Sequence, residues 1–373
     1  MAKPTAKEII PRLKAISANR VAELEHDISR LKSELRNKDA DMLDCTKVRE
    51  EIFKLAGYKA NPPKWTIQRK NKQHSAGIPV IFASDIHAGE VVNPSEINGL
   101  NAYNLSICEQ RFRKLISRAI DLCKNHMGNC QTYHGIIFAL GGDMISGDIH
   151  RELTRTNEKA SLPTLVFLFD LFVWGIKTLA AQFENVFVPG VSGNHGEQRL
   201  DSHKPSVKSY AHTNYDWLLY TLLEKHFQDN PKIQFLVPQD NDARFKIFDK
   251  RILLTHGNAI GVKGGDGMIG SVGPIARGAI KLQNQAASMG VDFDLVMMGH
   301  WHRFYDDGIA LVNGTLKGHD EYAARVLRAP YSPPFQLLFF IHEEWGRTAT
   351  WRVWVDDNRV KTKPGKWVST FER

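Results

Sequence analysis

The chain has 373 residues, of which 42% are hydrophobic and 24% charged, a composition that excludes a disordered chain, a collagen or a disulfide scaffold. Its four cysteines form no Cys-x-x-Cys pair, which predicts reduced thiols and a cytoplasmic protein. The net charge of +8 is uneven, because residues 1–72 hold 17 basic and 10 acidic side chains while the remainder holds 32 and 31. A basic segment joined to a near-neutral body suggests an anionic partner, most simply nucleic acid.

The N-terminal part of the chain, over residues 5–56, predicts helix. Apolar residues from Val21 to Leu35 step by 3, 4, 3 and 4, which is the a/d spacing of a coiled coil. This seam covers only about two and a half heptads. A short coiled coil that self-associates or docks a partner and a helical hairpin that packs on the body both stay open. We expect a basic helical or short coiled-coil segment over residues 1–57 and a polar linker over 58–76.

From residue 77 onward, short apolar runs alternate with stretches of helical periodicity. This alternation is typical of an α/β sheet whose faces are covered by helices. Asp249 and Lys250 are expected to form a turn between two strands, and the last three strand-like runs, which have little helix between them, are expected to pair antiparallel. We expect strands at 78–83, 135–140, 185–191, 232–237, 244–248, 251–255, 294–298, 303–312, 335–342 and 349–355, and helices at 106–125, 163–183, 211–228 and 274–289.

Neither the first residues nor the most apolar stretch predicts a membrane protein. The N-terminal sequence has no apolar core of the kind that a signal peptide needs. Residues 162–181 are strongly apolar but contain Asp170 and Lys177, which a membrane span rarely tolerates. We therefore expect a buried core helix there and no association with a membrane.

Polar clusters stand directly after five of the predicted strands. Open α/β sheets bind ligands outside the carboxyl ends of their strands, so these clusters should converge on one site. Alternate residues of an extended chain point to the same side, which would aim both ends of an Asp-x-His or His-x-His step into that site. Imidazole and carboxylate without thiolate suit Mn, Fe, Zn or Ni, and the ordered set predicts a dinuclear metal site. The clusters are Asp85-Ile86-His87, Gly141-Gly142-Asp143, Gly193-Asn194-His195, His256-Gly257 and Gly299-His300-Trp301-His302.

This ordered set of Asp-x-His, Gly-Asp, Gly-Asn-His, His-Gly and Gly-His-x-His resembles the calcineurin-like metallophosphoesterases. The resemblance covers residues 77–345 and implies an α/β/β/α sandwich with mixed β-sheets, here with an N-terminal helical extension. We expect the domain to span residues 77–355 and to be followed by a basic C-terminal tail over 356–373. The implied reaction is hydrolysis of a phosphate ester by a hydroxide that bridges two divalent ions, for which Mn is expected and Fe, Zn or Ni are alternatives.

The resemblance also implies a role for each residue of the clusters. Asp143 would bridge the two ions, and His195 would not be a ligand but would assist departure of the leaving group. Many relatives carry an acidic residue directly after Gly-Asn-His, whereas this chain has Gly196 and then Glu197, so residue 196 cannot orient His195. One ion would be held by Asp85, His87, Asp143 and His302, and the other by Asp143, Asn194, His256 and His300.

The flanking motifs bear on the substrate. The Asp-x-His-x-Gly pattern and the Gly-His-x-His ending resemble the DNA nuclease branch that processes double-strand breaks, and compact versions of the family with a similar layout occur in phage genomes and would act in the host cytoplasm. We therefore expect a phosphodiesterase or nuclease acting on DNA. The alternatives are a protein or small-molecule phosphomonoesterase and a partner-tethered scaffold with secondary catalysis. Candidate substrate-binding residues on cationic loops beside the metals are His150, Arg151, Arg199 and Lys204.

Overall fold

The computed structural model describes residues 27–30, 32, 77–127, 133–199, 210–260 and 272–356. The chain divides into two units, Met1–Lys59 and Ala60–Arg373. In the first unit, residues 27–30 and 32 are helical and exposed. The rest of the predicted N-terminal helix and the expected boundaries at residues 57 and 76 lie outside the described residues.

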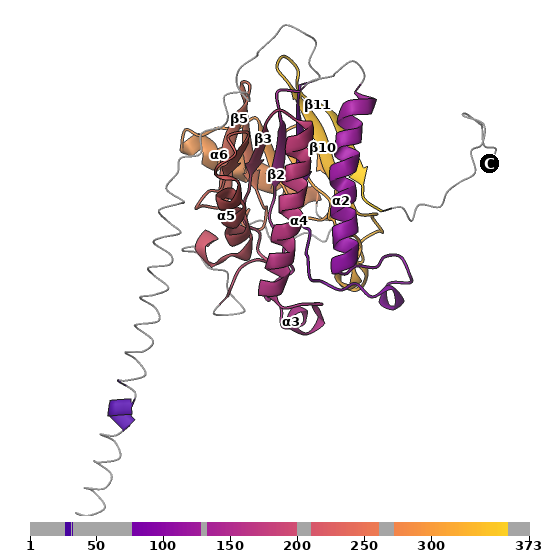
Figure 1. Cartoon of the computed structure of the whole chain (residues 1–373), viewed down its shortest axis with the longest axis vertical. Helices are drawn as coiled ribbons and strands as arrows, with labels where there is room; N and C mark the ends of the chain where they lie inside the picture. The colour runs from indigo at the N-terminus through magenta and orange to yellow at the C-terminus, as the bar shows by residue number, and fades with distance from the viewer. Residues whose placement is uncertain are drawn as a thin grey trace, which may run out of the picture. The chain divides into compact units, whose positions relative to one another are not determined.

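A six-stranded mixed sheet forms one half of the second unit (Figure 1). The first four strands of the chain are parallel neighbours within it, while β10 pairs antiparallel with both β1 and β11. The carboxyl ends of β1, β2 and β3 therefore meet at one edge. In sheet order the strands are β11 (Gly346–Trp354), β10 (Phe335–His342), β1 (Ile78–Ala83), β2 (Ile136–Leu140), β3 (Val186–Pro189) and β4 (Ile233–Leu236).

A five-stranded sheet forms the other half. Strand β7 lies parallel to both β6 and β9. The antiparallel pairing expected of the late strands is confirmed for β8, β10 and β11, whereas β9 is antiparallel to β8 but parallel to β7. The turn between β5 and β6 consists of Phe248 and Asp249, one residue earlier than expected, with Phe248 in the left-handed region at φ 54°. In sheet order the strands are β5 (Asp242–Ile247), β6 (Lys250–Thr255), β7 (Leu295–Met298), β9 (Ala310–Val312) and β8 (Tyr305–Asp306).

Helices cover the outer face of each sheet. Helices α2, α4 and α5 lie against the six-stranded sheet, and α6 lies against the five-stranded one (Figure 1). The long helices are α2 (Leu105–Asp121, continued by η3, Leu122–His126), α4 (Ser161–Gln182), α5 (Tyr215–Phe227) and α6 (Val272–Ser288). The short ones are η2 (Pro94–Glu96), α3 (Leu153–Thr156), η4 (Ala211–Thr213) and α7 (Glu321–Arg325).

Three apolar layers separate these elements, and β1 shows how one strand serves two of them. Ile81 and Ala83 pack into the layer beneath α2 and α4, whereas Val80 and Phe82 face the layer between the two sheets. The third layer lies between α6 and the five-stranded sheet. Because strand side chains alternate between faces, a strand buried on both sides must be apolar throughout, as β1 is. The predicted α/β/β/α sandwich is confirmed.

Helix α4 is, among the described residues, the one helix long and apolar enough to cross a membrane by length and composition. Its side chains Leu168, Phe172 and Ile176 are fully buried in the layer against the six-stranded sheet. Phe172 packs on Phe112 of α2 and on Phe138 of β2, with ring centroids 4.9 and 6.0 Å apart. This side of the helix contributes to the core.

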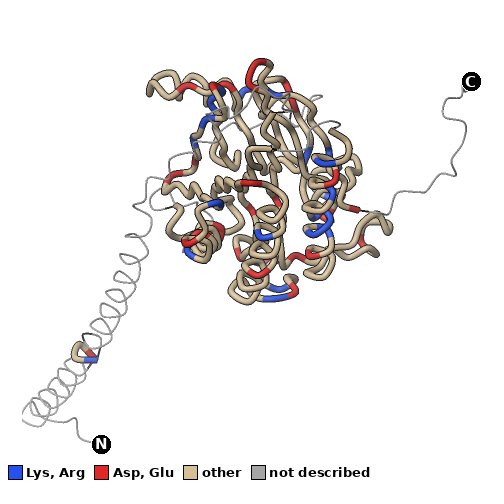
Figure 2. The backbone as a smooth tube through the Cα atoms, turned by 45° about the horizontal axis from the view of Figure 1, so that its top comes forward, with Lys and Arg blue, Asp and Glu red and all other residues tan. Residues whose placement is uncertain are grey.

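Acidic and basic residues both occur throughout the described part of the second unit. Figure 2 shows acidic and basic positions interspersed along the helices and loops. This agrees with the near-neutral balance of the chain beyond residue 72 and leaves most of the net positive charge in residues 1–72.

Candidate metal centre

The loops after β1, β2, β6 and β7 bring six of the seven predicted ligands together. The groups below have ligand atoms within 4.8 Å of one another, and His87 and Asp143 each belong to two of them. Strand ends from both sheets meet here, so the site lies where the two layers of the sandwich share an edge. The groups are Asp85, His87 and His302; His87, Asp143 and His195; and Asp143, His256 and His300.

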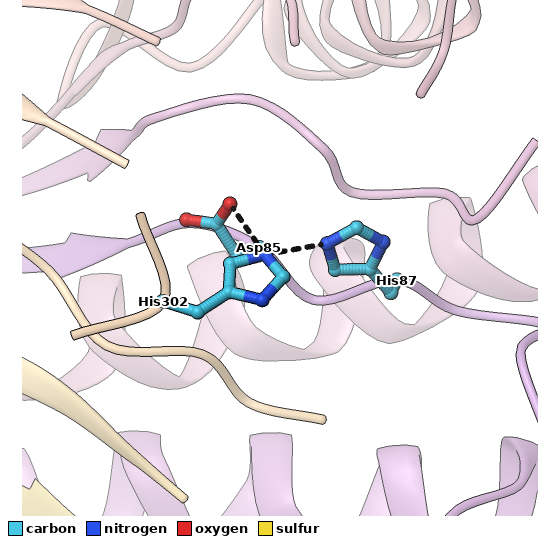
Figure 3. A group of neighbouring side chains, drawn as sticks. All are labelled: Asp85, His87 and His302. Atoms are coloured by element: carbon cyan, nitrogen blue, oxygen red, sulfur yellow. Dashed lines mark hydrogen bonds and ion pairs between the residues drawn. The ribbon is translucent and has the colours of Figure 1, made fainter. Parts of the chain in front are cut away.

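The first group surrounds the Nε2 atom of His302 (Figure 3). That nitrogen lies 3.2 Å from Oδ1 of Asp85 and 3.0 Å from Nε2 of His87. A single proton on Nε2 of His302 cannot form full hydrogen bonds to both neighbours, whereas a cation placed among the three atoms would bind all three. Separations of about 3 Å are those of neighbouring ligand atoms around an ion with bonds of about 2.1 Å. The residues therefore fit a divalent metal.

Asp143 belongs to both of the other groups. Its Oδ2 atom lies 3.0 Å from Nε2 of His256 and 4.0 Å from Nε2 of His87, which places the carboxylate between the two halves of the site. Asn194 contributes its side-chain oxygen at 3.1 Å from the same nitrogen of His256. The Nδ1 atom of His256 lies 2.8 Å from the carbonyl oxygen of Gly141. This contact orients the ring and directs Nε2 at Asp143.

Burial and neighbouring charges set the protonation of these groups. Burial lowers the pKa of His87 well below its usual range and lowers that of His300 to about 4, so both are neutral near pH 7, the form that ligates metals. Burial acts to lower the pKa of His256 as well, but the Asp143 carboxylate outweighs it and raises the pKa to about 9. Against its own burial, Asp143 has a lowered pKa because of His256 and His195. The pocket around Asp143 thus favours a positive charge.

The backbone at the site is unusual. Five of the predicted ligands have left-handed backbone, a conformation that non-glycine residues rarely adopt and that costs of order 1–3 kcal/mol each. The expectation of an extended Asp-x-His and His-x-His chain is therefore wrong. The loops curl sharply. This curl, and not the alternation of side chains along an extended strand, brings the ligand side chains together. The five are Asp85 (φ 53°), His87 (51°), Asp143 (54°), His300 (66°) and His302 (52°).

Two glycines of the clusters are needed because a side chain would not fit. A Cβ atom at Gly193 would lie 2.1 Å from Oδ1 of Asp143. One at Gly299 would lie 2.6 Å from Oδ2 of Asp85. These close approaches let one loop press against a ligand carried by another, so the glycines belong to the site through packing.

His195 belongs to the group with His87 and Asp143, and its ring is held by the backbone. Its Nδ1 atom is 2.8 Å from the carbonyl oxygen of Ser146, and its ring centroid is 4.4 Å from that of His87. The Ser146 carbonyl therefore orients this ring. The buried Glu197 accepts a hydrogen bond of 2.7 Å from Nε of Arg199.

The candidate substrate-binding residues have different surroundings. His150 is exposed, and its ring centroid lies 6.0 Å from that of His195. Arg151 is exposed next to it. Arg199 forms the ion pair with Glu197, and Lys204 lies outside the described residues.

A buried charge network that the sequence did not predict lies beneath His87. Oε2 of Glu90 lies 3.7 Å from Nδ1 of His87, a buried atom for which the described residues supply no hydrogen-bond partner. Lys317 places its Nζ atom 2.8 Å from Oε1 of Glu90 and 2.5 Å from Oδ2 of Asp320. The Asp-x-His-x-Gly-Glu string carried the only signal for Glu90, and Lys317 lies too far along the chain to be linked to it by pattern.

A second feature that the sequence did not predict is a carboxylate in the first turn of α5. Asp216 is fully buried, and its side chain accepts hydrogen bonds from the backbone of the loops after β2 and β3. Burial, with the Asp143 carboxylate second, raises the pKa of Asp216 to about 7. In the sequence it is an ordinary acidic residue at a helix start, where acidic side chains are common.

Comparisons with known proteins add the following. No family model matches the sequence, and no curated protein matches it. Among solved structures, the chain is similar to a single-residue variant of Vps29 from Entamoeba histolytica, at 12% identity and a TM-score of 0.31, covering 74% of this chain and 98% of that one. It is similar to a dimetal phosphatase from Danio rerio, at 10% identity and a TM-score of 0.35, covering 75% and 99%. It is also similar to the sulfate thiohydrolase SoxB of Thermus thermophilus in complex with glycerol, at 8% identity and a TM-score of 0.30, covering 77% and 58%.

Its own fold and side chains define the class of this protein. It is an α/β/β/α sandwich whose strand-end loops from both sheets hold a cluster of carboxylates and imidazoles. The donor set and its spacing fit divalent metal ions.

Proposed function

We propose that this protein is a phosphoesterase that works with two divalent metal ions. The observation that carries the proposal is that Asp143 belongs to two neighbouring groups of potential ligands, because ions that share a ligand are held close together. Asp85, His87 and His302 would hold one ion, and Asn194, His256 and His300 the other, with Asp143 between them. We take Mn as the ion of choice, since oxygen and imidazole ligands suit it.

The residues of the site would divide the work. Two bound ions would bind phosphate oxygens, lower the pKa of a water and neutralise charge on the phosphoryl oxygens. Asp143 would keep the ions at a fixed separation. His195 presents Nε2 to the site because its Nδ1–H donates to the Ser146 carbonyl, so in its doubly protonated form it would donate the proton on Nε2 to the departing oxygen.

For the substrate, we propose a phosphodiester of DNA. The supporting observations are the excess of positive charge in residues 1–72 and the exposed His150 beside His195, which the exposed Arg151 follows in the chain. Cationic groups on both sides of the scissile bond would hold the flanking phosphates and give binding that weakens with salt. The basic N-terminal segment would retain DNA, self-associate or dock a partner, in the cytoplasm of the cell in which the protein acts.

The test compares two small esters. Mn-loaded protein is assayed on bis(p-nitrophenyl) phosphate and on p-nitrophenyl phosphate, with Asp143→Asn as the blank. Preference for the diester supports the proposal, and scission of linear single- and double-stranded DNA is then measured. Preference for the monoester, with DNA left uncut, would identify a phosphatase instead. Hydrolysis of neither ester would refute the phosphoesterase itself.

A further inference from the structure

One buried carboxylate connects two of the loops that carry the candidate ligands. The Oδ2 atom of Asp216 accepts hydrogen bonds from the N–H of Asp143 at 2.8 Å and from the N–H of Gly193 at 2.9 Å. Its Oδ1 atom accepts a third from the N–H of Met144 at 3.1 Å. Gly193 directly precedes Asn194, so this single side chain fixes the backbone at Asp143 and next to Asn194 at once.

The segment that carries Asp216 also fixes the other side of the Gly193 peptide. Asn214 donates from Nδ2 to the carbonyl oxygen of Gly193 at 2.7 Å, and the hydroxyl of Tyr210 donates to the same oxygen at 2.7 Å. Oδ1 of Asn214 accepts the N–H of Asp216 at 2.9 Å, which makes Asn214 the N-cap of α5. Both the N–H and the carbonyl of Gly193 are therefore held by side chains from the start of one helix.

Residue 196, which follows Asn194 and His195, has no room for a side chain. The carboxylate that holds this loop comes instead from Asp216 on α5. A Cβ atom at Gly196 would lie 3.2 Å from Cγ of Asp216 and 2.4 Å from Oδ1 of Asn214. The side chains of Asp216 and Asn214 thus occupy the space that a side chain on residue 196 would need. Glycine at 196 and the acid on α5 are two parts of one arrangement.

This arrangement acts on Asp143 through its backbone. Asp143 has a left-handed backbone at φ 54°, and its N–H points at Asp216. Its side chain accepts the N–H of His195 on Oδ1 and faces His256 with Oδ2. Without the Asp216 carboxylate, the buried N–H groups of Asp143, Met144 and Gly193 would lose their acceptor, and the loops would shift to find others.

We propose that Asp216 is a positioning residue of the metal centre, which sets the separation of Asp143 and Asn194 and thereby the affinity for metal. The inference rests on the proposed metal-dependent function. Residues that orient metal ligands in this way typically contribute 10–100-fold to metal affinity.

The test measures Mn²⁺ binding to the full-length protein by isothermal titration calorimetry, with the electron paramagnetic resonance spectrum of bound Mn²⁺ as a second readout. Asp216→Ala removes all three acceptor contacts, and we expect it to weaken binding by about 10–100-fold for at least one ion. Asp216→Asn keeps the shape and one acceptor oxygen, so its affinity should lie between those of Asp216→Ala and the wild type. Leu223→Ala is the matched control, because it removes a fully buried side chain from the same helix.

The outcomes separate the two proposals. If the wild type binds no Mn²⁺, the proposed function fails. If the wild type binds Mn²⁺ and both Asp216 variants bind it with wild-type affinity, the role of Asp216 is overturned while the function stands. Equal loss of affinity in Asp216→Ala and Leu223→Ala, at matched thermal midpoints, would also overturn it, because general destabilisation would then account for the effect. Should Asp216→Ala not fold, the comparison of Asp216→Asn with Leu223→Ala decides.

Discussion

The Nε2 atom of His256 lies 3.0 Å from Oδ2 of Asp143, although the two residues follow strands of different sheets. Asp143 follows β2 in the six-stranded sheet and His256 follows β6 in the five-stranded one. A second contact across the sandwich joins Nε2 of His302 to Oδ1 of Asp85 at 3.2 Å. A carboxylate in the position of Asp143 would serve both metal ions.

Asp143→Asn should abolish metal-dependent stabilisation. Mn²⁺ that binds only the folded protein raises its stability, by about 2.7 kcal/mol at a concentration of 100 Kd. The wild type should therefore melt at a higher temperature with Mn²⁺ than with a chelator, and the variant should melt at the same temperature in both. Thermal melts and the metal content after desalting are the measurements. Asp170→Asn, at an exposed position of α4, is the control and should respond as the wild type does. A full thermal shift in Asp143→Asn would contradict a bridging role.

His195→Ala should retain metal but slow turnover. If the imidazole donates a proton to the leaving group, kcat should fall by a factor of order 10²–10⁴. The metal content after desalting should stay at the wild-type value. His126→Ala, at an exposed site on η3, should change neither quantity. Loss of metal from His195→Ala would instead make His195 a ligand, as its place in a group with His87 and Asp143 would then indicate.

Gly193→Ala should disrupt the site through packing alone. The added Cβ would lie 2.1 Å from Oδ1 of Asp143 and 2.2 Å from its backbone nitrogen, so one of the two loops must move. Overpacking of this kind costs about 1–3 kcal/mol, and Mn²⁺ affinity should fall with it. Urea unfolding and metal titration are the measurements. Gly273→Ala in α6 meets only the end of the Arg277 side chain and should preserve both. Wild-type Mn²⁺ affinity in Gly193→Ala would show that the loops are free to separate.

Asp320 should stabilise the protein in a defined range of pH. Burial acts to raise the pKa of Asp320, but the Lys317 ammonium outweighs it and lowers the pKa from 3.8 to about 2. A lowered folded-state pKa means that the stabilisation is present above about pH 4 and is lost as the pH falls towards 2. Its size is roughly 2 kcal/mol.

The measurement is urea unfolding of the wild type and of Asp320→Asn at several pH values. The variant should be less stable by roughly 2 kcal/mol at pH 7, and the difference should shrink between pH 4 and 2. Glu344→Gln, at an exposed site, should differ little from the wild type at any pH. A difference between wild type and Asp320→Asn that is independent of pH would contradict the role of the ion pair.

Much of the fold could be predicted because its signals are local. The fully apolar run at β1 indicates a strand buried on both faces, and the helical periodicity before β3 and β7 predicts α4 and α6 to within a few residues. Which strands pair with one another was harder to predict from the sequence. The parallel pairing of β9 with β7 depends on contacts between segments that no sequence spacing records.

The sequence by itself determined which residue types follow each strand, because the strands and polar clusters follow one another directly along the chain. It therefore also determined the chemistry of the site. Only the tertiary structure decided how those clusters meet. Asp85 and Asp143 take a left-handed backbone where the loops meet. The Ser146 carbonyl contacts His195, and the Asp216 carboxylate contacts the N–H of Gly193, and both are contacts between different elements. Such contacts arise when buried N–H groups and charges must find partners wherever the packed layers bring them, and a linear pattern does not show where that is.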